Sequence, residues 1–140
     1  PPAFWKRRFK MIRQFESIVT RSGTHIIKFH LHISKAEQKR RLLERIDDPH
    51  KNWKFSPADV GERRHWDAYI DAYEQAIEAT STKHSPWYVI PADDKWYARL
   101  AMAAIIYRYA TSLDLSYPTL DQGAMAALRD ARAELLAEED

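Results

Sequence analysis

Apolar residues recur every three or four positions in several stretches of the chain, the spacing that places them on one face of a helix. This pattern predicts four helices, over residues 4–20, 35–46, 62–79 and 94–113. At the start of the second helix, Ser34 and Glu37 have the spacing of a capping box, in which each side chain accepts from the backbone N–H of the other residue. Pro49 ends that helix, because proline disfavours helical geometry at the residue before it.

Two short apolar stretches, residues 25–33 and 86–91, instead predict β-strands. A helix lies between them, so they form a strand–crossover–strand unit, which is typical of an α/β fold with a parallel sheet. Two short parallel strands do not make a stable sheet, and we therefore expect further strands upstream. The pattern leaves one alternative open, a small and mostly helical domain with a single strand pair.

The last part of the chain differs from the rest in composition. Residues 124–140 are rich in Ala and Glu, which favour helix but offer little bulk for packing. We expect residues 1–123 to form the folded domain and residues 124–140 to form a helical or disordered tail.

The composition narrows the possible compartments and metal sites. The 140 residues include no cysteine, which excludes disulfides and thiolate metal sites and fits a reducing compartment. The longest uncharged stretch, residues 101–107, is too short to span a bilayer, and the N-terminus lacks the apolar segment of a secretory signal. We therefore expect a cytoplasmic protein without a membrane partner.

The formal net charge of +2 hides an uneven distribution of cations. Lys and Arg concentrate in residues 6–13, 35–45 and 51–64. Basic clusters of this kind suit a polyanion, which could be nucleic acid, membrane headgroups or a phosphate chain.

Three segments narrow this choice: LHISKAEQ (31–38), DPHKNWKFS (48–56), and TST leading into PWYVIPADDK (80–95). Together they resemble the second family of polyphosphate kinases, in particular the branch that accepts both nucleoside mono- and diphosphates. The resemblance runs from about residue 5 to residue 120 with order and spacing intact, and it covers the C-terminal portion of such an enzyme.

The resemblance implies a P-loop kinase-like fold, a parallel sheet flanked by helices, with a helical lid over about residues 38–61. It implies phosphoryl transfer between inorganic polyphosphate and AMP or ADP, with Mg²⁺ held mainly by the upstream half, and a homo-oligomer. The chain departs from the family pattern at one point: its glycines, at positions 23, 61 and 123, cannot form a GxxxxGK loop. We therefore expect residues 1–123 to supply the lid and part of the nucleotide pocket, and to be inactive alone.

Arg41 and Arg45 are the first candidates for phosphate binding. They lie one helical turn apart and share a face, and guanidinium groups match phosphate oxygens in shape and charge. The alternative is a solvated helix face on which these arginines pair with Glu37 and Glu44.

Lys51 and Lys54 flank Trp53 just after the predicted helix break, as lid cations beside an aromatic anchor would. The alternative is a charged surface loop with Trp53 packed in the core. Lys28 lies within the first strand, where it could face a phosphate-binding crevice or extend to solvent from the sheet edge. These three lysines complete the predicted phosphate-binding set.

Asp93, Asp94 and Lys95 follow the second strand at its carboxyl end, where open α/β sheets bind ligands. With Arg99 one turn later, they are the predicted nucleotide-binding residues. The alternative is that Asp93 or Asp94 caps the next helix and that Arg99 pairs with Asp94.

No catalytic residue and no metal site is predicted within the chain. His25, His30 and His32 alternate along a strand without a convincing third ligand, and they read as ordinary strand residues. Two other functions stay open: a non-enzymatic basic helical module that binds a polyanion such as nucleic acid, and a fragment of another nucleoside or nucleotide kinase. Nucleic acid is the less favoured partner.

Overall fold

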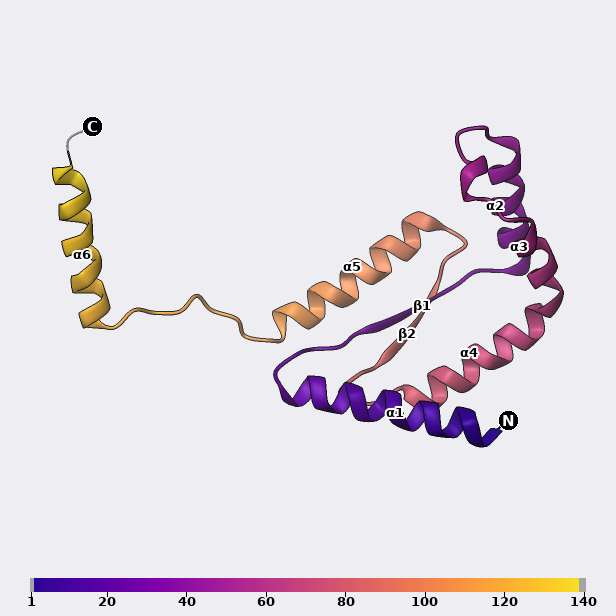
Figure 1. The fold of residues 1–140 in the computed structure, drawn as a ribbon, viewed down its shortest axis with the longest axis horizontal. Helices are drawn as coiled ribbons and strands as arrows, with labels where there is room; N and C mark the ends of the chain where they lie inside the picture. Colours follow the sequence, from indigo (N-terminus) through magenta and orange to yellow (C-terminus); the bar gives the residue numbers. More distant parts are fainter. Residues whose placement is uncertain (1, 139–140) are drawn as a thin grey trace. The chain divides into compact units, whose positions relative to one another are not determined.

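In the computed structural model two strands, β1 (Lys28–His32) and β2 (Trp87–Pro91), pair in parallel (Figure 1). The structure describes residues 2–138, and within them the sheet consists of these two strands. Their register places Lys28 opposite Trp87 and His32 opposite Pro91. The connection between them contains the predicted helices, so the α/β class with a parallel sheet is confirmed.

The helices follow the predicted periodicity closely. In chain order they are α1 (Pro2–Arg21), α2 (Lys35–Asp47), α3 (Pro57–Glu62), α4 (Trp66–Thr80), α5 (Lys95–Thr111) and α6 (Gln122–Ala137), with short 3-10 turns η1 (Asn52–Lys54) and η2 (Arg63–His65). After α1, Gly23 adopts a φ of +90°, a left-handed conformation that glycine allows at a helix end.

The chain forms two compact units, the first ending at Ile105 and the second beginning at Ile106 within α5. This boundary lies before residue 123, where we expect the folded domain to end. The expected tail is helical as far as Ala137. Residue 1 and residues 139–140, which belong to the two predicted domains, lie outside the described residues.

The core of the first unit lies between the sheet and α5. Ile90, Ala92 and Ala98 are buried there, and Phe29 and Tyr88 pack against them from adjacent strands. Helices α1 and α4 lie against the other face of the sheet (Figure 1).

The start of α2 shows how the two strand ends are joined. The Ser34 hydroxyl accepts from the Glu37 N–H at 3.0 Å, which is one half of the predicted capping box. The other half is wrong, because the Ser34 N–H donates instead to the carboxylate of Asp93 at 2.7 Å. This bond connects the residues that follow β1 to those that follow β2.

Candidate functional site

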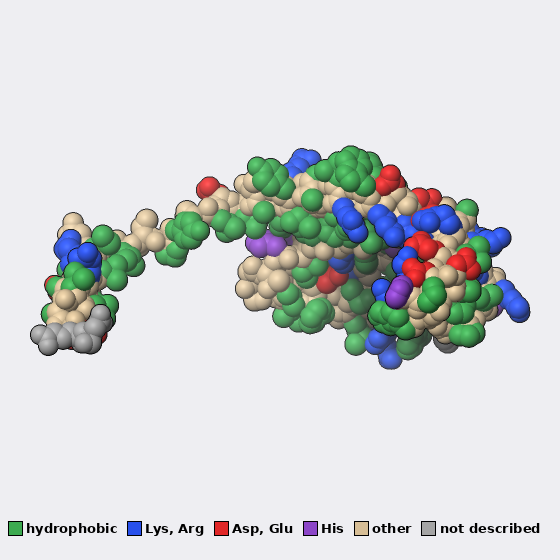
Figure 2. Space-filling model, turned by 90° about the horizontal axis from the view of Figure 1, so that it is seen from above, with side chains coloured by type: hydrophobic (Ala, Val, Ile, Leu, Met, Phe, Trp, Pro, Cys, Tyr) green, Lys and Arg blue, Asp and Glu red, His purple; other side chains and the backbone are tan. Residues whose placement is uncertain are grey.

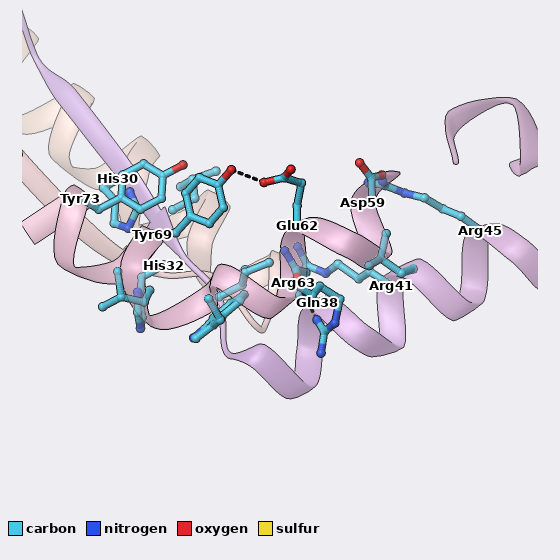
Figure 3. A pocket seen from close by; sticks show the side chains of 15 residues that line it. His30, His32, Gln38, Arg41, Arg45, Asp59, Glu62, Arg63, Tyr69 and Tyr73 are labelled. Carbon is cyan, nitrogen blue, oxygen red and sulfur yellow. Dashed lines mark hydrogen bonds between the residues drawn. The ribbon is translucent and has the colours of Figure 1, made fainter. Parts of the chain in front are cut away.

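A cavity of about 490 Å³ runs beside β1 to the carboxyl end of that strand. Figure 3 shows two different ends. One end is aromatic, with Tyr69 and Tyr73 from α4 beside His30 of β1. The other end is charged and is formed by α2, α3 and η2, including Arg41 and Arg45.

Arg41 joins α2 to the carboxyl end of β2. Its Nε donates to Glu37 at 2.6 Å, and its Nη2 donates to the backbone carbonyls of Ala92 at 2.6 Å and Asp93 at 3.1 Å. The planar fork of arginine reaches these three acceptors at once. Arg41 therefore positions α2 over the end of the sheet, with the guanidinium at the cavity wall.

Arg45 lies one turn further along α2 and lines the same cavity. Within residues 2–138, its side chain forms no hydrogen bond or ion pair, and Figure 3 shows it pointing toward Asp59. Glu37 and Glu44 of the same helix are engaged elsewhere, Glu37 by Arg40 and Arg41 and Glu44 mainly by Lys51. Asp59, the carboxylate that Arg45 faces across the cavity, forms no ion pair with it among the described residues. Arg45 thus offers an uncommitted guanidinium to a ligand.

The carboxylate of Glu37 is strongly held in its charged form. Hydrogen bonds from Arg40 and then Arg41 lower the pKa of Glu37 to about 2. A carboxylate bound by two guanidinium groups cannot be protonated without losing both interactions. It therefore fixes the orientation of the arginines at the start of α2.

Arg63 also lines the cavity, although from the sequence alone we interpret this residue as a surface charge. It lines the cavity from η2 and donates to the side chain of Gln38 at 2.5 Å and to the carbonyl of Lys35 at 3.2 Å. Arg63 lies 28 residues from Lys35, so only the folded chain reveals the contact. Together, Arg41, Arg45 and Arg63 bring three guanidinium groups to one end of the cavity.

The segment after α2 carries the predicted lid cations. Lys51 pairs with Glu44 at 2.6 Å and with Asp48 at 3.0 Å, and these bonds raise the pKa of Lys51. The Lys54 ammonium lies 4.8 Å from the ring centroid of Trp53, which is 78% exposed. Trp53 is therefore not a core residue, and this segment offers a solvent-facing aromatic ring beside a cation.

Figure 2 shows how charges are distributed over this part of the molecule. Lys and Arg side chains gather over the end formed by α2 and the segment that follows it, with Asp and Glu side chains between them. The ion pairs here are short-range, between residues of α2 and of the turn that follows it, residues 48–51. The surface is therefore a mixed network of cations and carboxylates.

Two residues after β2, Asp93 and Asp94, have structural roles. The Asp94 carboxylate accepts from the N–H groups of Trp96 and Tyr97 at 2.8 and 3.2 Å, which confirms the capping alternative for this residue. Asp93 receives the Ser34 N–H described above. Lys95 and Arg99 are exposed on the first turns of α5. The structure places all four predicted nucleotide-binding residues at the carboxyl end of β2, and their contact with a nucleotide stays a prediction.

Lys28 is the predicted phosphate ligand that the structure separates from the others. It lies at the start of β1, nearly buried, where it contacts Glu16 of α1 and the end of α4. Neither a crevice nor a sheet edge exposes it to solvent. Sequence pattern could not identify this partner, since Glu16 reads as one polar position of an amphipathic helix.

Two absences apply to the part of the chain that the structure describes. It contains no group of three or more His, Asp or Glu side chains placed to hold a metal ion. None of its helices combines the length and apolar character needed to cross a membrane.

Residues 1–116 match the family described as Polyphosphate kinase 2 (PPK2). The chain is 48% identical over 134 residues to the ADP-polyphosphate phosphotransferase of Rhodopseudomonas palustris, and it covers 46% of that protein. It is also 48% identical over 118 residues to the AMP/ADP-polyphosphate phosphotransferase of Meiothermus ruber, and covers 44% of it. The chain spans less than half the length of each enzyme.

Another relative has nearly the same span. An uncharacterized protein in the chlN 3' region of Leptolyngbya boryana is 48% identical over 135 residues, which is 96% of this chain and 99% of that protein. Among solved structures, polyphosphate kinase 2 from Arthrobacter aurescens TC1 superposes with a TM-score of 0.82 at 46% identity, over 92% of this chain and 47% of that one. The fold seen here is thus one part of a larger known structure.

Proposed function

The chain belongs to the polyphosphate kinase 2 family, and from this premise we propose that it serves phosphoryl transfer between inorganic polyphosphate and ADP or AMP. In this proposal residues 38–61, which include most of α2, all of η1 and most of α3, form the lid. The carboxyl end of the sheet forms part of the nucleotide pocket. Relatives named as ADP- and AMP/ADP-polyphosphate phosphotransferases support this substrate class.

The observation that carries the proposal is the uncommitted guanidinium of Arg45. Arg41 and Arg63 line the same end of the cavity, but each is bonded to other parts of the chain. Arg45 is free to bind a phosphate group, and its positive charge does not depend on pH in the physiological range. Arg41 and Arg63 then hold α2 and η2 in place and add positive potential around the bound phosphate.

Lys54 and Lys51 extend this positive potential beyond the cavity. A polyphosphate chain carries charge along its whole length, so cations on the exposed segment after α2 can bind successive phosphates. Lys51 must leave Glu44 and Asp48 to do so, whereas Lys54 gives up only a contact with Trp53. We therefore propose Lys54 as the first lid cation to engage the polyphosphate.

Magnesium, which the family resemblance implies, finds no suitable set of ligands among residues 2–138. In our proposal it is held by residues outside this part of the structure. The role of the present residues is to bind and orient phosphate groups, which is a large part of catalysis in phosphoryl transfer.

The proposal is tested by titrating the full chain with polyphosphate in a calorimeter, comparing the Arg45→Ala and Lys39→Ala variants. Lys39 is exposed on the same helix and does not line the cavity, so both changes remove one positive charge from α2. We expect Arg45→Ala to weaken binding roughly tenfold, as loss of a charge-assisted hydrogen bond would, and Lys39→Ala to change it little.

Equal losses in the two variants would contradict the proposal, because binding would then follow net charge alone. Duplex DNA serves as the competing ligand. If it bound as tightly as polyphosphate, with a steep dependence on salt, the chain would instead be a general polyanion-binding module.

A further inference from the structure

Two side chains of opposite charge face each other in the cavity without forming a salt bridge. Arg45 of α2 and Asp59 of α3 both line the cavity, and Figure 3 shows Arg45 pointing toward Asp59. Within residues 2–138, neither of these side chains forms a hydrogen bond or an ion pair. The cavity therefore holds one cation and one anion that are both uncommitted.

The other Arg and Glu side chains that line the cavity have partners. The Glu62 carboxylate accepts from the hydroxyl of Tyr69 at 2.5 Å. Arg41 donates to Glu37 and to the backbone that follows β2, and Arg63 donates to residues of α2. Among the described residues, Asp59 is thus the cavity carboxylate that is available to interact with Arg45.

The segment that joins α2 to α3 keeps the two charges close together. The side-chain amide of Asn52 donates to the carbonyls of Arg45 at 2.8 Å and Ile46 at 2.7 Å, which holds the segment against the last turn of α2. Asp59 then lies in the first turn of α3. Arg45 and Asp59 are both partly buried, so solvent and salt screen their charges less than they would on an open surface. Each charge therefore acts on the other across the cavity.

We propose that Asp59 determines the affinity of the phosphate-binding site, because its carboxylate competes with an incoming polyphosphate for the guanidinium of Arg45. This inference rests on the proposed function. A phosphate group that binds Arg45 gives up none of its own charge, so it must replace the attraction between Arg45 and Asp59 and also lie beside a second negative charge. Both effects weaken binding. The site consequently holds the phosphate chain less tightly than its guanidinium groups alone would, which favours release after transfer.

The test measures the binding of polyphosphate to the full chain by calorimetry. Asp59→Asn keeps the shape of the side chain and removes its charge, and we expect it to bind polyphosphate roughly fivefold more tightly than the parent. Asp71→Asn makes the same change at an exposed position of α4 that does not line this cavity, and we expect it to leave the affinity unchanged. In an Arg45→Ala background, Asp59→Asn is expected to give no gain, because the competition requires Arg45.

Three outcomes would contradict the inference. Unchanged binding in Asp59→Asn would show that the carboxylate does not oppose the ligand. Weaker binding would show that the ligand needs the carboxylate, for example to hold a cation carried by the phosphate chain. An equal gain with and without Arg45 would show that Asp59 acts through net charge alone.

The same measurements separate this inference from the function on which it rests. If Arg45→Ala weakens binding while Asp59→Asn leaves it unchanged, the proposed function stands and the role of Asp59 is wrong. If neither the parent nor Asp59→Asn binds polyphosphate, both proposals are wrong.

Discussion

The ammonium group of Lys28 on β1 donates to both carboxylate oxygens of Glu16 on α1, at 2.7 and 2.9 Å. A third bond runs to the carbonyl of Thr80 at the end of α4, at 2.8 Å. The two charged side chains are only 13% and 10% exposed. One buried cation thereby holds the first strand against two helices, and each charge depends on the other for its stabilisation.

Glu16→Gln is expected to destabilise the chain by about 3 kcal/mol, because it leaves the Lys28 ammonium buried without a counter-charge. Urea unfolding followed by circular dichroism measures this loss. The double variant Lys28→Met, Glu16→Leu removes both charges and is expected to recover most of the stability. A Glu16→Gln chain as stable as the parent would contradict the buried ion pair.

Glu37 is expected to make the stability of the folded chain depend on pH in the acid range. Its pKa is about 2 in the folded chain against 4.5 ordinarily, so the folded state binds the proton less readily than the unfolded state. The stabilisation is fully present above pH 4.5 and is lost as the pH falls from there toward 2. Melting temperatures measured across this range should fall less steeply in Glu37→Gln than in the parent. Glu74→Gln, an exposed position on α4, is the control and should follow the parent.

Asp94 is expected to contribute to stability through its cap at the start of α5. Asp94→Ala removes the acceptor for the N–H groups of Trp96 and Tyr97, and should cost about 1 kcal/mol in the free energy of unfolding. Asp94→Asn keeps a capping oxygen and should cost less. If the two variants lost equal stability, the carboxylate charge rather than the cap would be responsible.

Trp53 should report directly on ligand binding by the segment after α2. Its ring is exposed and lies under the Lys54 ammonium, a contact that contributes only about 0.5–1 kcal/mol at the surface. Polyphosphate that draws Lys54 away from the ring should change tryptophan emission in the parent chain. The change should be absent in Trp53→Phe, and an unaltered response in that variant would assign the signal to another tryptophan.

Periodicity and capping signals were sufficient to predict α1, α2, α4, α5 and the parallel strand pair. They failed where an element boundary depends on tertiary contacts. A single helix was expected over residues 62–79, whereas α3 ends at Glu62, η2 intervenes, and α4 begins at Trp66. The hydrogen bonds of Arg63 to Lys35 and Gln38 lie in this interruption, and no local pattern in the sequence encodes them.

The candidate site was predictable as a set of residue types and not as a set of partners. Arg41 and Arg45 were identified by their shared helix face, but spacing alone could not show that Arg41 bonds to Ala92 and Asp93 while Arg45 stays unpaired. Lys28 showed the limit most clearly, because its charge suggested a ligand site, whereas its side chain pairs with Glu16 on α1. Such distinctions depend on which surfaces the fold brings together.

The parallel register has a consequence for how the chain folds. Lys28 lies opposite Trp87, so the first bond between the strands must close a loop that contains α2, α3 and α4. Closing a long loop costs entropy before any ladder bond is gained, and contacts of this sequence separation slow folding. The hydrogen bonds of the helices are local, so the helices can begin to form before the strands meet. We therefore expect the sheet, and with it the alignment of Arg41 against Ala92, to be completed in a late step of folding.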